Sequence, residues 1–91
     1  MPTETILQHY SREALKRATI EPMDDGNFVA EVPGLEGVIA FADTERECVV
    51  EVYSVVEDWA RFRVQRSLYL PVLGDVDLNT EENRKLALEY S

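Results

Sequence analysis

The feature that most constrains this chain is a helix-start signature placed directly in front of a long apolar run. Thr44 and Glu47 have the spacing of a capping box, in which the threonine hydroxyl serves an orphan amide and the glutamate reaches back. The run that follows is rich in valine, which favours strands by propensity. Its apolar residues nevertheless recur at helical spacings of four and three: Cys48, Val52, Val55, Trp59 and Phe62. Because burial of a continuous face usually outweighs propensity, we predict one helix over residues 44–67.

Three short extended segments precede this helix. Residues 19–23 form the first, and Pro22 either weakens this strand or places it at the edge of a sheet. An Asp-Gly turn, which is a hairpin signal, leads to residues 28–32, whose alternation is typical of a strand with one better-buried face. After a Pro-Gly reversal, residues 38–42 are apolar on both sides, which predicts a strand inside the sheet or under a helix.

The two ends of the chain add further elements. An apolar stripe predicts an N-terminal helix over residues 3–18, with Pro2 and Thr3 at its start. In the C-terminal tail, residues 68–91, we expect a short last strand at Val76–Leu78 and a terminal helix that Asn79 and Glu82 cap. That helix would carry Leu86, Ala87 and Tyr90.

These elements predict a single α+β domain over residues 1–91, in the order α-β-β-β-α-β with a possible final helix. The sheet and the long helix occupy residues 19–67, as a three-stranded antiparallel meander packed against the helix, and the tail adds the short fourth strand. The chain has no apolar run of membrane-spanning length, no signal-peptide pattern and a single cysteine. We therefore expect a cytoplasmic protein.

The acidic residues are concentrated in one part of the sequence. The net charge is −9, and residues 20–47 contain eight acidic residues against Arg46 alone, a net −7. Nucleic acids and anionic membranes need cationic contacts, so we expect the protein to bind neither directly. A basic protein is the partner that this charge permits.

Five acidic residues are the candidates for partner contact: Asp24, Asp25, Glu31, Glu36 and Asp43. They have two other interpretations. Asp and Glu occur on turns and caps for local reasons, so these residues could simply form a solvated surface. They could also hold Mg²⁺ in a minimal nuclease, but only Glu31 is expected within a strand, and adjacent strand positions would be needed.

The remaining reactive residues have structural explanations. His9 lies beside an apolar stripe with no partner evident in the sequence, and Cys48 belongs to the helical seam, so we expect a packing or surface role for both. Together they are too few for the usual zinc site. Arg61, Arg63 and Arg66 could contact phosphate, but compensation of the dipole of the long helix explains them equally well, and the net charge opposes nucleic-acid binding. We expect no metal, no cofactor and no enzymatic activity.

Two stretches resemble a known family. "FVAEVPGLEGVIAFADTEREC" is similar to the HicB family of type II antitoxins, which have a strand, a Pro-containing turn that ends in glycine, a strand and a Thr-x-x-Glu helix start. "VVEDWARFRVQRSLYLPVLGDVDL" resembles the later segment of short members. The resemblance covers roughly residues 19–78. It implies a partial RNase H-like fold and a partner that is a small basic mRNA-cleaving toxin, HicA.

The resemblance also leaves alternatives. Residues after Gly74 are too few for the DNA-binding domain that many members carry, so we expect no direct operator binding. An orphan adaptor without a toxin is one alternative function. A self-associating module is another, because small sheets with exposed edges tend to pair, and we expect a homodimer or higher homo-oligomer.

Overall fold

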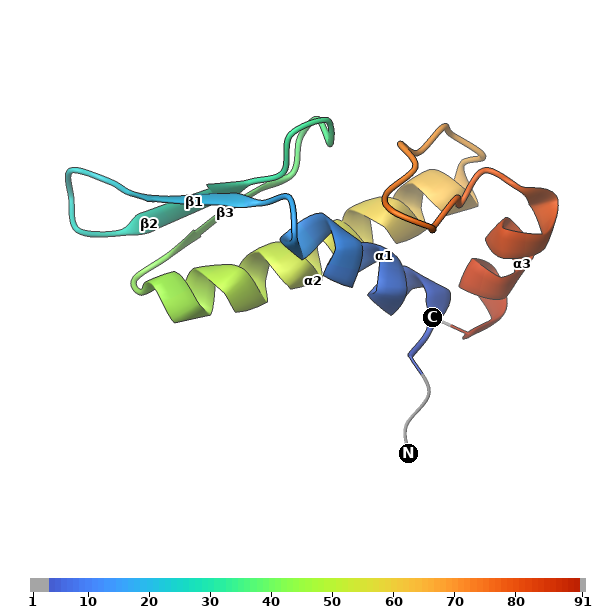
Figure 1. Ribbon diagram of the computed structural model, residues 1–91, viewed down its shortest axis with the longest axis horizontal. Coiled ribbons are helices and arrows are strands. Elements are labelled where there is room, and N and C mark those ends of the chain that lie inside the picture. The colour runs from blue at the N-terminus through green and yellow to red at the C-terminus, as the bar shows by residue number, and fades with distance from the viewer. Residues whose placement is uncertain (1–3, 91) are drawn as a thin grey trace.

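A sheet lies against one long helix, with a further helix before and after this pair (Figure 1). The computed structural model describes residues 4–90. In chain order the elements are α1 (Ile6–Leu15), β1 (Thr19–Pro22), β2 (Phe28–Glu31), β3 (Ile39–Ala42), α2 (Glu45–Gln65) and α3 (Glu81–Tyr90). The predicted α+β class is confirmed, with three antiparallel strands in one sheet.

The three strands form a meander of order β1-β2-β3. Pro22 lies in an edge strand, one of the two predicted outcomes. Proline has no amide hydrogen to donate, and an edge strand tolerates this because it has a neighbouring strand on one side only. The β1–β2 connection is the expected tight turn. It is closed by a 2.7 Å hydrogen bond from the amide of Met23 to the carbonyl of Asn27, and Gly26 has a φ of 88° that favours glycine.

Of the two positions predicted for residues 38–42, inside the sheet or under a helix, the structure shows the second, because the strand packs against α2 and does not lie inside the sheet. β3 is the second edge strand. Ala30 and Ala40 pair across β2 and β3 and are buried, whereas the alternate residues Ile39 and Phe41 are 43% and 54% exposed. The reason is that helices cover one face of the sheet only, so alternate side chains of the strand face solvent.

The long helix is confirmed, but its buried seam differs from the prediction. Its first turn has half of the predicted capping box: the amide of Glu47 donates to the hydroxyl of Thr44 at 3.1 Å, but within the described residues the Glu47 carboxylate does not accept from the amide of Thr44. The buried residues follow a spacing of four: Cys48, Val52, Val56, Ala60 and Val64. Val55 and Trp59 are only partly buried, and Phe62 is 49% exposed. A spacing of four drifts around the helix, so the buried stripe turns away from Phe62 as α2 passes from the sheet to α1.

The N-terminal helix starts later than predicted. Thr5 is its cap and Gln8 completes a capping box, with hydrogen bonds of 3.0 and 3.1 Å. Residues 2 and 3, the predicted start, lie outside the described residues. The apolar stripe is confirmed, because Leu7, Tyr10 and Ala14 are all buried.

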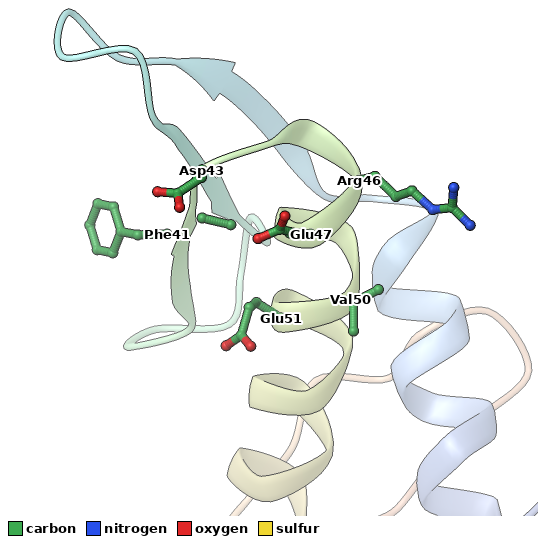
Figure 2. Close-up of a pocket in the computed structure, with 7 residues that line it drawn as sticks. Phe41, Asp43, Arg46, Glu47, Val50 and Glu51 are labelled. Atoms are coloured by element: carbon green, nitrogen blue, oxygen red, sulfur yellow. The ribbon is translucent and has the colours of Figure 1, made fainter.

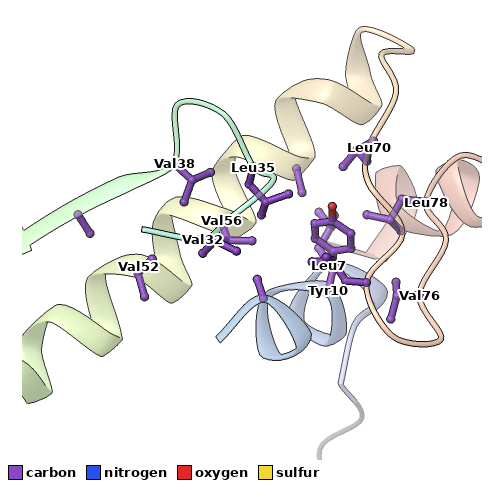
Figure 3. Packing of buried hydrophobic residues seen from close by; sticks show 14 of the residues in the cluster. Leu7, Tyr10, Val32, Leu35, Val38, Val52, Val56, Leu70, Val76 and Leu78 are labelled. Carbon is purple, nitrogen blue, oxygen red and sulfur yellow. The ribbon is translucent and has the colours of Figure 1, made fainter. Parts of the chain in front are cut away.

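The tail contributes to the core without forming a strand. Among residues 4–90, the predicted strand at 76–78 is reduced to an isolated bridge between Leu73 and Val76. Figure 3 shows Leu70, Val76 and Leu78 packed beside Leu7 and Tyr10 of α1. A short segment with no neighbouring strand can bury its side chains but cannot build a ladder.

The terminal helix is confirmed, with a different cap from the one predicted. Thr80 caps it, since its hydroxyl accepts from the amide of Asn83 at 3.1 Å. Asn79 instead holds the backbone of Leu70, accepting from its amide and donating to its carbonyl at 2.8 Å each. Ala87 of this helix is buried and Leu86 is 39% exposed. No helix in the described part of the chain is long and apolar enough to cross a membrane.

Candidate partner-binding surface

The five predicted contact residues do not form one cluster. All are exposed. Asp24 and Asp25 lie in the β1–β2 turn, and Asp43 follows β3 at the same end of the sheet, because Phe28 pairs with Ala42. Glu31 ends β2 at the opposite end, where Glu36 lies in the β2–β3 turn. The antiparallel meander therefore splits the acidic segment into two groups.

Asp25 also has a local structural role. Its carboxylate accepts a 3.0 Å hydrogen bond from the amide of Asn27 and a 3.3 Å bond from the amide side chain of that residue. This is an Asx turn, which stabilises the hairpin without any partner. The turn interpretation of Asp25 is thus confirmed.

A hollow beside the end of β3 combines acidic and apolar side chains. It lies between the last residues of β3 and the first turns of α2 (Figure 2), and we refer to it as the β3–α2 hollow. Its lining residues are Phe41, Ala42, Asp43, Arg46, Glu47, Val50 and Glu51. The hollow lies where the chain leaves the edge strand β3 and turns back into the first turns of α2.

The carboxylates of the β3–α2 hollow are not neutralised. Asp43, Glu47 and Glu51 have no ion-pair partner among residues 4–90. Arg46 is the one cation of the lining, and Figure 2 shows its guanidinium pointing away from all three carboxylates. Three uncompensated negative charges over a small surface attract a cation and favour its approach through solvent.

The apolar part of the hollow is accessible as well. Phe41 is 54% exposed and Val50 is 64% exposed. A lysine or arginine has an alkyl stem that packs on apolar surface and a charged head that makes charge-assisted hydrogen bonds to carboxylates. Figure 2 shows Phe41 and Val50 pointing to opposite sides of the carboxylates, so a partner would place basic heads between them and apolar surface at the two margins of the β3–α2 hollow.

Sequence reasoning misses Glu47 and Glu51 as contact residues. The sequence assigns Glu47 only to the helix cap, and Glu51 is one more charge on a helix surface. The signal that could have found them is their spacing of four, which places both on one side of α2. The sequence alone does not show that this side borders an open strand.

A second cluster joins α1 to the tail. Nε2 of His9 lies 3.2 Å from Oδ1 of Asp75, so the histidine has a partner that the sequence did not reveal. A carboxylate oxygen of Glu13 lies close to both residues, and the ligand atoms of all three lie within 4.8 Å of one another. Glu13 is buried, and it accepts from Lys16 at 2.8 Å and from Arg17 at 3.3 Å. The hydrogen bond from Lys16 is the main cause that lowers the pKa of Glu13. Since these cations already neutralise Glu13, the cluster is suited to joining the segments rather than to holding a divalent metal.

Cys48 has the packing role that the sequence predicts. It is fully buried, and its Sγ lies 3.7 Å from the carbonyl oxygen of Ala40. Burial is the main cause that raises the pKa of its thiol, and the nearby charge of Glu51 raises it further. A buried thiol with a raised pKa is a poor nucleophile.

The arginines near the end of α2 make local contacts. Arg61 pairs with Glu57 at 2.9 Å and with Asp58 at 3.1 Å. Arg63 lies over the ring of Trp59, 5.1 Å from its centroid, and Arg66 lies 4.7 Å from the centroid of Phe62. These contacts stabilise the helix end and give the arginines structural roles within the chain.

Comparison with known proteins places the chain in a family. A search of curated proteins finds no match. The crystal structure of TTHA0281 from Thermus thermophilus is similar, with a TM-score of 0.72, 33% sequence identity, and coverage of 82% of this chain and 94% of that one. Residues 9–71 match a family described as UPF0150-like, which is of the HicB-like kind. This match spans most of the chain, and the chain belongs to the UPF0150-like family.

Proposed function

We propose that this protein is an antitoxin-type binding protein that neutralises a small basic mRNA-cleaving toxin of the HicA kind. The observation that carries the proposal is the β3–α2 hollow, which is lined by three carboxylates that have no ion-pair partner among residues 4–90 and by two exposed apolar side chains. Membership of a family of the HicB-like kind supports the same function. The net charge of −9 suits a cationic partner and disfavours nucleic acid.

The mechanism of neutralisation is occlusion. A ribonuclease binds anionic RNA through basic side chains, and a protein that occupies these side chains with carboxylates competes with RNA directly. Long-range attraction to the acidic protein speeds the encounter, and apolar contact with Phe41 and Val50 slows dissociation. In this proposal the protein needs no metal, no cofactor and no catalytic residue of its own.

A double charge reversal tests the proposal. The test uses any small basic ribonuclease that a neighbouring reading frame encodes, purified and assayed for RNA cleavage with and without this protein. Glu47→Lys with Glu51→Lys should weaken binding and restore cleavage, mainly by slowing association. Each exposed charge contributes about 0.2–1 kcal/mol, so neutralising both as Glu47→Gln with Glu51→Gln should weaken binding about 2- to 30-fold.

Glu81→Lys with Glu82→Lys is the matched control, since it makes the same change of net charge on the exposed first turn of α3. If this control weakens binding as much as the hollow variant, the net charge rather than the hollow determines association. If no basic ribonuclease is encoded nearby and none co-purifies, the antitoxin function is wrong and an orphan adaptor takes its place.

A further inference from the structure

β3 has an open edge that the sheet itself does not protect. The other edge, β1, carries Glu21 and Pro22, a charge and a residue without an amide donor, and such residues prevent a further strand from pairing. β3, Ile39–Ala42, contains neither a charged residue nor a proline. The protein therefore has one edge that disfavours strand addition and one that accepts it.

The β3–α2 hollow occupies the place of the missing neighbour strand. Phe41, Ala42 and Asp43 form its wall on the sheet side, and Glu47 and Glu51 of α2 form its floor (Figure 2). A strand paired with β3 would lie over this floor, at the usual distance of about 4.8 Å between strands. Its side chains would point alternately toward α2 and toward the open face of the sheet.

The spacing of the two glutamates matches that of a strand. Glu47 and Glu51 are four residues apart on α2, which corresponds to about 6 Å along the helix axis. Successive side chains on one face of a strand are about 6.8 Å apart. Alternate residues of an added strand could thus each meet one carboxylate, and the intervening residues would lie beside Ile39 and Phe41 on the open face.

We propose that the partner adds an extended strand to the free edge of β3, with lysine or arginine at alternate positions above Glu47 and Glu51 and apolar residues between them. This inference rests on the proposed function and specifies how the basic partner is held. A second copy of the chain fits less well, because its own β3 would place Ala40 and Ala42 above the carboxylates and leave them without counter-charges. Main-chain hydrogen bonds supply affinity in such strand addition, and alternate side chains supply specificity.

A set of synthetic peptides tests the mode of binding. The probe is Val-Lys-Val-Lys-Val-Lys-Val, and its control is the block sequence Val-Val-Val-Val-Lys-Lys-Lys, which has the same composition and charge. Binding is followed by amide shifts in NMR spectra. We expect the alternating peptide to bind more tightly and to perturb residues 39–42, and we expect Glu47→Gln with Glu51→Gln to weaken its binding about 2- to 30-fold.

N-methylation separates strand pairing from simple attraction. The alternating peptide is methylated at every second amide, in each of the two possible phases. Only one set of amides faces β3, so one phase should lose about tenfold or more in affinity and the other should bind as before. Equal binding of the block peptide, or equal binding of both methylated phases, would overturn the proposal.

Two further measurements separate the proposals and the partners. If the basic ribonuclease binds but the amides of β3 that face away from β2 exchange as fast in the complex as in the free protein, strand addition is wrong while the antitoxin function stands. If the peptide binds by strand pairing and no basic ribonuclease binds, the antitoxin function is wrong while strand addition to β3 stands. A dimer in sedimentation, with these amides protected in the absence of any peptide, would assign the edge to a second copy instead.

Discussion

The indole Nε1 of Trp59 donates a 3.0 Å hydrogen bond to the backbone carbonyl oxygen of Glu36, and this bond ties α2 to the β2–β3 turn. Trp59→Phe keeps most of the apolar area and removes the donor, so we expect the free energy of unfolding to fall by about 0.5–1.5 kcal/mol. Urea denaturation measures the change. Leu88→Ala, at a 53% exposed position on α3, is the control and should change stability by less than about 0.5 kcal/mol. Equal effects of the two variants would contradict the role of the hydrogen bond.

Asn79 should be important for the order of the tail. Asn79→Ala removes both 2.8 Å hydrogen bonds to the backbone of Leu70, a buried residue, and leaves an amide and a carbonyl unpaired. We expect a loss of about 1–3 kcal/mol in unfolding free energy and faster hydrogen exchange at residue 70. Glu82→Ala, at an exposed position on α3, should change neither quantity. Unchanged exchange at residue 70 in Asn79→Ala would refute this role.

Glu13 should make the protein less stable in acid. Its hydrogen bonds from Lys16, and then from Arg17, hold the pKa of its carboxyl below the ordinary value of 4.5. A lowered pKa in the folded state stabilises the protein above pH 4.5, and this contribution is lost as the pH falls through the folded-state pKa. Glu13→Gln should therefore lower stability at pH 7 and flatten the decline below pH 4.5.

The comparison for Glu13 is the urea midpoint at pH 7 and at pH 3, with Glu82→Gln as the exposed control. A pH dependence of Glu13→Gln that is as steep as that of the unmodified protein would show that other carboxyl groups are responsible.

Gly74 should be energetically coupled to Glu13. Gly74 has a φ of 59°, and a Cβ at this position would overlap the carboxylate of Glu13. Gly74→Ala should cost about 1–2 kcal/mol from the left-handed backbone alone, and more from displacement of Glu13. In a Glu13→Ala background only the backbone cost remains. A double-mutant cycle measured by denaturation should give a coupling of roughly 0.5–3 kcal/mol, and strictly additive effects would rule out the overlap.

The thiol of Cys48 should be unreactive in the folded protein. It is fully buried, and burial raises its pKa, so both access and thiolate formation are unfavourable. We expect labelling by a thiol reagent to proceed only in denaturant, at the rate of unfolding or opening. Val50→Cys, at a 64% exposed position, provides a reactive control in the same chain. Fast labelling of native Cys48 would contradict the buried position.

Local signals in the sequence determined the elements of this fold. The Asp-Gly turn, the Thr44 cap and the periodicity of residues 48–65 each act through neighbours a few positions away, and the structure has the hairpin and the long helix that they predict. Pro22 likewise predicts an edge strand from the chemistry of one residue. Such short-range physics is contained in the sequence itself.

The tertiary structure alone decided which surfaces stay open. Val55 and Val56 are equally apolar in the sequence, and only the packing of α2 against the sheet and α1 buries Val56 more completely. Tertiary packing also leaves the apolar β3 at an edge of the sheet. It brings Glu47 and Glu51 of α2 and Phe41 of β3 into the lining of one hollow. Burial depends on which distant segments cover a residue, and no local pattern encodes that. The candidate binding surface therefore lies where the first turns of α2 meet the open edge of β3.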